Sequence, residues 1–204
     1  MLFAEQSLRF NAALFYYDYK DQQVFMNQPS KVPGAVPLQL LENVADSKIY
    51  GAEADMFYAP TEQLEIQFGV GYIPHAEFEE FVDPVGVSLT NNRLPFTSKW
   101  NINGELSYSY NIASGTLKTS LGFDYQSEYY FDQLQTDYAK QDGYVLWRMN
   151  AQYEAEQWQA NIWAKNLFDE EYSHLKFDLR NFLGMLEDFK GEGRRVGLDV
   201  SYRF

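Results

Sequence analysis

The chain closes with Arg195-Val196-Gly197-Leu198-Asp199-Val200-Ser201-Tyr202-Arg203-Phe204, a stretch that alternates strictly between two kinds of side chain. The even-numbered residues are apolar, and the odd-numbered ones are polar, charged or glycine. In an extended chain, successive side chains point to opposite faces, so all the apolar residues share one face. This period of two predicts a final β-strand over 196–204, with one face against an apolar environment and the other against water.

The same alternation recurs upstream and predicts an all-β chain of about eight strands. The other candidate strands are residues 8–16, 50–58, 64–72, 100–110, 117–125, 145–153 and 158–164. No long segment has an apolar stripe at helical spacing, so any helix should be a short piece within a loop.

The connections between these strands are alternately short and long. Short turns are expected at 59–62, 112–115 and 154–156, and long polar loops at 29–37, 82–95, 132–143 and 173–193. If consecutive strands are antiparallel neighbours, all the short turns lie at one end of the sheet. Short periplasmic turns opposite long extracellular loops are typical of an outer-membrane β-barrel.

Composition agrees with strands and excludes several other classes of protein. Aromatic residues make up 18% of the chain, and there is no cysteine for a disulfide or a thiolate metal site. A net charge of -13 disfavours nucleic acid as a partner. No apolar run approaches the roughly 20 residues of a membrane helix. Residues 1–6 do not resemble the signal peptide that a secreted barrel needs, so we expect that Met1 is not the natural start.

A soluble β-sandwich that binds carbohydrate is an alternative, because its strands alternate as well. Strand length and the loop asymmetry favour the barrel. So do aromatic residues near strand ends, where an interfacial girdle would place them. These residues are Tyr16, Tyr17, Tyr19, Tyr58, Tyr129 and Tyr130.

One motif resembles a known family. Asn166-Leu167-Phe168-Asp169-Glu170-Glu171-Tyr172 is similar to the Asn-Leu-Phe-Asp-x-x-Tyr element at the top of the penultimate strand of TonB-dependent outer-membrane receptors. Residues 45–53 and 11–20 resemble two other strands of that family. The resemblance covers nearly the whole chain, so residues 1–204 are expected to be the C-terminal part of such a barrel, an antiparallel transmembrane segment. The plug domain and TonB-binding segment of the family are not found in these residues.

The resemblance implies part of an outer-membrane receptor that binds and imports a scarce nutrient with energy from the TonB complex. A ferric siderophore is the expected ligand, because it is the commonest substrate class in the family; cobalamin, haem and carbohydrate stay open. The implied partners are the N-terminal barrel and plug of the parent receptor, the TonB complex acting through that plug, outer-membrane lipid and lipopolysaccharide, and the outer-membrane assembly machinery. That machinery is expected to recognise Val200, Tyr202 and Phe204.

The remaining candidate site residues also have simpler structural roles. In the family the motif residues Asn166, Leu167, Phe168, Asp169 and Tyr172 have a structural role, and we expect the same here. Loop aromatics offer ligand contacts or, alternatively, loop packing: Tyr129, Tyr130, Phe131, Tyr138, Phe177 and Phe182. His75, with Glu77, Glu79 and Glu80, lacks metal-site spacing. The adjacent pair Ser173-His174 does not provide a catalytic geometry. We therefore expect no enzyme, no cofactor and no metal site.

Eight strands cut from a larger barrel have two edges, and lipid penalises each unpaired backbone group by several kcal/mol. Either other strands of a receptor pair with these edges, or the edges meet in a self-contained eight-stranded structural or adhesive barrel of the OmpA type. The inward residues resemble a wall that faces water or a plug, which argues against the small barrel. They are Arg148, Lys165, Glu105, Asp124, Asn101, Asn103, Gly69, Gly71 and Gly122.

Overall fold

A computed structural model describes residues 2–3, 7–28, 38–112 and 114–204, most of which form one antiparallel sheet. The sheet has nine strands in the order β1-β2-β3-β4-β5-β6-β9-β10-β13. Their bounds are β1 Leu2–Phe3, β2 Leu8–Gln28, β3 Leu38–Tyr58, β4 Leu64–Glu80, β5 Trp100–Ile112, β6 Gly115–Gln126, β9 Tyr144–Ala155, β10 Trp158–Lys165 and β13 Arg195–Tyr202. The eight predicted strands are thus confirmed, and β1 adds a two-residue strand beside β2.

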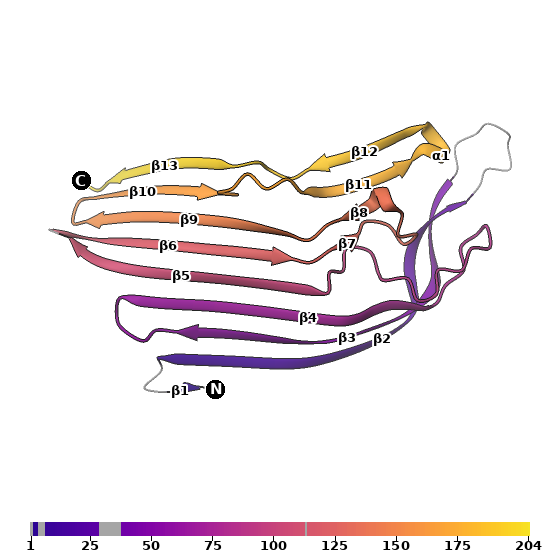
Figure 1. Ribbon diagram of the computed structural model, residues 1–204, viewed down its shortest axis with the longest axis horizontal. Coiled ribbons are helices and arrows are strands. Elements are labelled where there is room, and N and C mark those ends of the chain that lie inside the picture. Colours follow the sequence, from indigo (N-terminus) through magenta and orange to yellow (C-terminus); the bar gives the residue numbers. More distant parts are fainter. Residues whose placement is uncertain (1, 4–6, 29–37, 113) are drawn as a thin grey trace.

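The strands form a meander in which each one pairs with the next strand of the sheet along the chain (Figure 1). The turns β3–β4, β5–β6 and β9–β10 lie at one end, together with β1 and the C-terminus. The long connections that the structure describes lie at the other end, as predicted from the alternation of short and long linkers. The final strand therefore ends on the short-turn side, which is the periplasmic side of an outer-membrane barrel.

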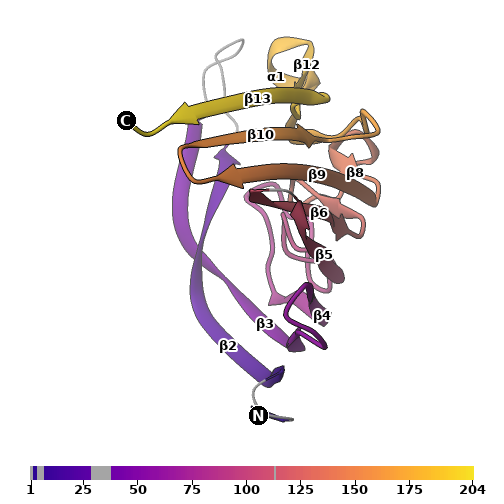
Figure 2. The ribbon, with the colours of Figure 1, turned by 90° about the vertical axis from the view of Figure 1, so that its left-hand side faces the viewer.

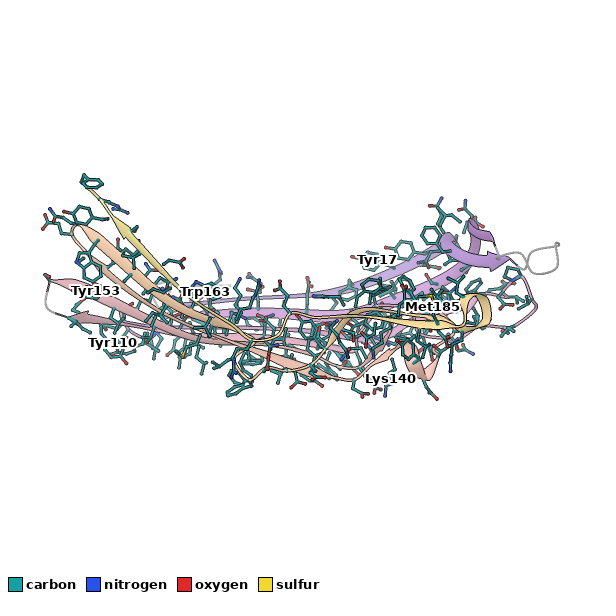
Figure 3. The ribbon with its side chains drawn as sticks, turned by 90° about the horizontal axis from the view of Figure 1, so that it is seen from above. Tyr17, Tyr110, Lys140, Tyr153, Trp163 and Met185 are labelled. Carbon is teal, nitrogen blue, oxygen red and sulfur yellow. The ribbon has the colours of Figure 1, made fainter. Side chains whose placement is uncertain are left out.

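Register joins the apolar residues of all eight long strands into one continuous face. Leu198 on β13 pairs with Ile162 on β10, and Leu121 on β6 pairs with both Leu106 and Met149. The sheet curves into an arc (Figure 2), and Tyr110, which pairs with Leu117, belongs to the apolar face. Seen from above, Tyr17 and Trp163 project to the concave side and Tyr110 to the convex side (Figure 3).

The arc is open within the described residues. The edge strands β2 and β13 are not hydrogen-bonded to each other, and β1 pairs only with Leu8 and Arg9 at the lower end of β2. The structure thus gives no support to the alternative of a self-closed eight-stranded barrel.

Three strands are much longer than predicted, one of them β4, which has 17 residues where a strand over 64–72 was expected. β2 and β3 have 21 residues each and extend beyond the membrane-spanning stretches at 8–16 and 50–58. A bulge at Asp21, where φ is +51°, shifts their register. Above the bulge, Val24 packs against the buried core formed with the connection 81–99, and the apolar alternation seen in the lower halves of the two strands fades. The loop predicted at 29–37 lies outside the described residues.

The long connections at the other end of the sheet are partly ordered into small elements. Residues 127–143 contain β7 Tyr129–Tyr130, the 3-10 helix η1 Asp137–Ala139 and β8 Lys140–Gln141. The stretch 173–193, expected to be a loop, is largely a hairpin of β11 Ser173–Leu179 and β12 Met185–Lys190, joined by the four-residue helix α1 Arg180–Leu183. Both helices are short pieces within loops, as predicted. Among the described residues, no helix is long and apolar enough to cross a membrane.

The connection 81–99 folds back onto the concave face of β3 and β4 and forms a small core there. Its buried members are Ala45, Ala76, Phe78, Phe81, Leu89 and Leu94. The sequence expectation of a solvated polar loop at 82–95 is therefore wrong for Leu89 and Leu94, which are 2% and 7% exposed.

Candidate functional site

Aromatic rings bound the convex face at two levels. At the loop end, Tyr50 stacks on Tyr16 and on His75 with ring centroids 6.3 and 4.8 Å apart, and Tyr72 stacks on Trp100 at 4.1 Å. At the short-turn end lie Tyr58, Tyr108, Tyr110, Tyr153, Trp158, Tyr202 and Phe204. From Trp100 to Tyr110, β5 covers roughly 33 Å, which at a tilt near 40° matches an apolar band about 25 Å tall.

Not all of the predicted girdle residues belong to these two levels. Tyr16 and Tyr58 do, but Tyr17 and Tyr19 occupy the opposite face of β2, because side chains alternate along a strand. Tyr129 is only 7% exposed inside the loops, where burial raises the pKa of its phenol. Tyr130 pairs with Lys140 in the small β7–β8 sheet. The girdle prediction is therefore wrong for these four tyrosines.

The concave face carries charged and polar groups that pair across strands. The Arg148 guanidinium on β9 forms ion pairs with Glu105 on β5, at 3.3 Å, and with Asp124 on β6. A second ion pair joins Lys118 Nζ to Glu65 at 2.7 Å. The other predicted inward residues lie on the same face according to the strand register. Lys165 is opposite Arg148 on one side and Arg195 on the other, and the rest are Asn101, Asn103, Gly69, Gly71 and Gly122. Such a surface suits water or a polar domain.

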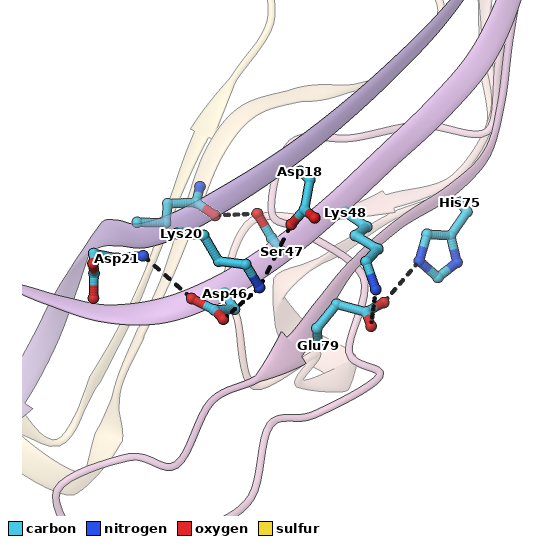
Figure 4. Close-up of polar contacts among 9 residues, drawn as sticks. Asp18, Lys20, Asp21, Asp46, Ser47, Lys48, His75 and Glu79 are labelled. Atoms are coloured by element: carbon cyan, nitrogen blue, oxygen red, sulfur yellow. Dashed lines mark hydrogen bonds and ion pairs between the residues drawn. The ribbon is translucent and has the colours of Figure 1, made fainter.

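His75, whose ring stacks on Tyr50 at the loop end of the convex face, lies beside carboxylates and a lysine (Figure 4). Its ring nitrogens are 3.7 Å from Glu77 and 3.4 Å from Glu79, and Lys48 Nζ binds Glu79 at 2.7 Å. In the part of the chain that the structure describes, no group of three or more His, Cys, Asp or Glu could hold a metal ion. The arrangement is that of a salt-bridged, solvated rim.

Asn166, the first residue of the family motif, fastens the start of the last long connection to its end. Its side-chain oxygen accepts the Glu170 amide N–H at 2.8 Å. Its amide nitrogen donates to the carbonyls of Glu170 and Glu192 at 2.9 and 3.0 Å. Asn166 is 7% exposed and has a φ of +48°, a left-handed conformation that Asn tolerates better than most residues.

The other four motif residues contact β9 or the end of the same connection. Asp169 accepts the Arg194 amide N–H, and the Leu167 amide N–H donates to the Trp147 carbonyl at 2.9 Å. Phe168 lies edge-on to the Trp147 ring, and Tyr172 stacks on Tyr144 at 5.0 Å. All of these contacts are internal to the chain, and they fix the base of the connection 166–194.

The six loop aromatics that were considered for ligand contact have different surroundings. Tyr129 and Phe131 form a buried core with Ala139, so they are not free to contact a ligand. Tyr130 and Tyr138 are half-buried, and Phe177 is exposed on the β11–β12 hairpin against Phe189. The side chain of Phe182 lies outside the described residues.

Arg93 joins the connection 81–99 to β4, a role that no sequence pattern indicated. Its guanidinium donates to the carbonyls of Ile73 at 2.6 Å and Thr97 at 2.9 Å, and more weakly to those of Pro74 and Ser98. Burial lowers the pKa of this guanidinium, which stays a cation held by carbonyl dipoles. The loop is thereby held against the wall.

An antiparallel meander whose apolar convex face lies between two aromatic girdles, with short turns at one end and long loops at the other, is a segment of a transmembrane β-barrel. The chain belongs to the family of TonB dependent receptor-like β-barrels, whose family model matches residues 2–167. The family is one of transport receptors, which are outer-membrane β-barrels.

Solved structures of such receptors share the fold. The ferric yersiniabactin uptake receptor FyuA from Yersinia pestis is 20% identical with a TM-score of 0.77, covering 95% of this chain and 27% of its own. The siderophore receptor PiuA from Acinetobacter baumannii is 20% identical with a TM-score of 0.72, covering 98% and 26%. The copper transporter OprC is 17% identical with a TM-score of 0.68, covering 97% and 29%. The chain thus spans about a quarter of the length of these receptors.

Proposed function

We propose that residues 1–204 form the C-terminal part of the barrel of a bacterial outer-membrane receptor, which binds a ferric siderophore and imports it with energy supplied through TonB. Membership of a transport-receptor family supports nutrient import in general. The siderophore receptors among the structural relatives support the narrower substrate class. The plug and the preceding strands would belong to the rest of that receptor, and TonB would act on it through the plug.

The observation that carries the proposal is a curved sheet with two open edges and a charged concave face. Within the described residues, β13 pairs with a strand on one side only, and no strand pairs with the outer side of β2 above Phe10. Lipid penalises every unpaired backbone group, so both edges need further strands. A lumen lined by the Arg148 cluster is too polar for a dry core and suits a plug domain with water.

Other residues have roles that follow from the same proposal. Val200, Tyr202 and Phe204 are exposed on the convex face at the periplasmic end, where the assembly machinery would bind them. Lipid and lipopolysaccharide would cover the apolar band and the rim above it. The motif Asn166–Tyr172 would serve loop architecture rather than ligand binding.

Reading the genomic DNA upstream of Met1 tests the proposal without any protein chemistry. An in-frame plug domain and about fourteen further strands, preceded by a signal peptide, are expected, because plugged outer-membrane transporters have barrels of about 22 strands. A signal peptide placed directly before residue 1 would contradict it and favour the small self-contained barrel.

A further inference from the structure

Three long connections at the loop end of the sheet are bonded to one another, although they are far apart in the sequence. They join β4 to β5, β6 to β9 and β10 to β13, and they comprise residues 81–99, 127–143 and 166–194. Surface loops usually open one by one, each at its own low free energy. The contacts between these three connections decide whether they can do so.

The β4–β5 connection is fastened to the β6–β9 connection through backbone groups. The Phe96 amide N–H donates to the Tyr130 carbonyl at 2.8 Å. The Asn92 side-chain amide donates to the Gln133 carbonyl at 2.9 Å. The Phe96 ring also lies edge-on to that of Phe131, with centroids 5.5 Å apart. Both hydrogen bonds end on carbonyls, so they fix the path of the partner chain and not only one of its side chains.

The β6–β9 connection is fastened in turn to the hairpin of β11 and β12. The Gln141 side-chain oxygen accepts the Ser173 amide N–H at 2.9 Å, and both residues are buried, at 6% and 2% exposure. Lys176 Nζ donates to the Lys140 carbonyl at 2.7 Å. Leu175 packs against the buried core of the β6–β9 connection, which consists of Tyr129, Phe131 and Ala139. Two connections therefore share one core, and neither can leave it without exposing apolar side chains.

Gln133 extends these links to the upper part of β2. Its carbonyl accepts the bond from Asn92, and its own side-chain amide donates to the Phe25 carbonyl at 3.1 Å. Val24 also contacts the buried core that the β4–β5 connection forms with β3 and β4. A continuous series of contacts thus runs from β2 through the β6–β9 connection to the β11–β12 hairpin.

We propose that the three connections open and move as one cooperative unit, so that a ligand or partner that displaces one of them displaces all three. Segments that share hydrogen bonds and a core open together, because the opening of one breaks the contacts of the next. All of these links lie within this chain, so the unit does not depend on which nutrient the parent receptor imports. Binding at any one connection is then coupled to the conformation of the other two.

Hydrogen exchange of the complete protein that contains this chain, isolated from outer membranes and followed by mass spectrometry, tests the proposal. In the wild type, the slowest amides of the three connections should share one protection factor to within about threefold. Gln141→Met keeps the length of the side chain and removes the acceptor of the Ser173 N–H. Exchange should become about tenfold faster in the β11–β12 hairpin, the usual effect of one lost buried hydrogen bond. It should rise by a similar factor in the β4–β5 connection, where no bond has been removed.

Asn92→Asp tests the same coupling from the opposite side. It removes the donor to Gln133, and it should speed exchange in the β11–β12 hairpin as well as in the β4–β5 connection, because coupling between two sites is reciprocal. The matched control is Asn11→Asp on the lower part of β2, where the Asn11 side-chain amide donates to Asp55 at 2.9 Å. This control should leave exchange in all three connections unchanged.

Faster exchange in Gln141→Met that is limited to the two connections joined by Gln141 would overturn the proposal. Widely different protection factors among the three connections of the wild type would overturn it as well, and so would acceleration of all three connections in the control. Slow exchange in β5, β6 and β9 shows that a variant is folded. Should one variant fail to fold, the other variant and the wild-type protection factors decide.

Discussion

The indole of Trp163 on β10 lies directly over the Cα of Gly197 on β13, its partner in the strand register. A Cβ atom at Gly197 would be 2.3 Å from Cζ2 of Trp163. The indole Nε1–H donates to the Asp199 carboxylate at 2.8 Å, two residues further along β13. The absence of a side chain at Gly197 thus leaves room for the Trp163 ring on the concave face, and this contact helps to hold β13 against β10.

Gly197→Ala should destabilise the barrel by about 1–3 kcal/mol, the usual cost of overpacking, because the indole must move and give up its bond to Asp199. Denaturant unfolding of the protein in detergent micelles, followed by tryptophan fluorescence, measures this loss. Gly71→Ala on the same face is the matched control, since its Cβ would be 3.9 Å from the nearest atom, and it should cost nothing. Equal effects of the two substitutions would show that Trp163 has no special role.

Arg93→Lys should release the connection 81–99 from β4. One ammonium cannot reach the carbonyls of Ile73 and Thr97 together, and a lost charged hydrogen bond in a half-buried place costs about 1.5–3 kcal/mol. Limited proteolysis should then cut within 81–99 in the variant at protease concentrations that leave the wild type intact. Protection equal to that of the wild type would mean that the hydrophobic contacts of Phe81, Leu89 and Leu94 hold the connection 81–99 in place without Arg93.

Asn166→Ala should loosen the base of the connection 166–194 by about 2–4 kcal/mol, because it removes three hydrogen bonds and places a Cβ-bearing residue without a polar side chain at a φ of +48°. Asn166→Gly removes the same bonds without the strain, so it should be milder by about 1–2 kcal/mol. Hydrogen exchange of residues 166–194 compares the two variants. Identical exchange in both would rule out a contribution from backbone strain.

The stability of the bulge in β2 should depend on pH, because Asp46 contributes to it only when ionised. The Lys20 ammonium, bound to Asp46 at 2.8 Å, and the Asp21 amide N–H lower the pKa of this carboxyl below its ordinary value of 3.8. A depressed folded-state pKa contributes stability that is present above 3.8 and lost as the pH falls through the lowered value. Carboxyl NMR of labelled Asp46 should give a midpoint below 3.8, rising toward it in Lys20→Met. An unchanged midpoint in the variant would rule out the ion pair as the cause.

Period-two alternation was a reliable guide wherever one face of a strand meets lipid. It identified β13 from Val196, Leu198 and Val200, and it placed Arg148 and Glu105 on the opposite face from Leu106 and Met149. It could not show how far β2 and β3 extend toward the loop end, because the residues around Asp21 and Asp46 do not alternate between apolar and polar side chains. Aromatic residue type alone also placed Tyr17 and Tyr19 in the girdle, which is wrong. The alternation of faces along the strand, counted from Tyr16, puts both on the opposite face.

The loops were the least predictable part. Tyr129 and Phe131 are buried there, while Phe96 is exposed, and nothing in the local pattern separates these rings. Their exposure depends on contacts between connections distant in sequence, such as that from Phe96 to Tyr130. The same holds for Arg93, whose carbonyl partners lie on β4 and within its own loop.

The environment of the two faces of β13 tests the central claim most directly. The chain contains no cysteine, so single cysteines at positions 196, 198 and 200 and at 197, 199 and 201 can each carry a spin label in the native membrane. We predict that labels at the even positions are accessible to oxygen dissolved in lipid, and labels at the odd positions to an aqueous nickel complex. Equal access of the nickel complex to both series would contradict a transmembrane barrel wall.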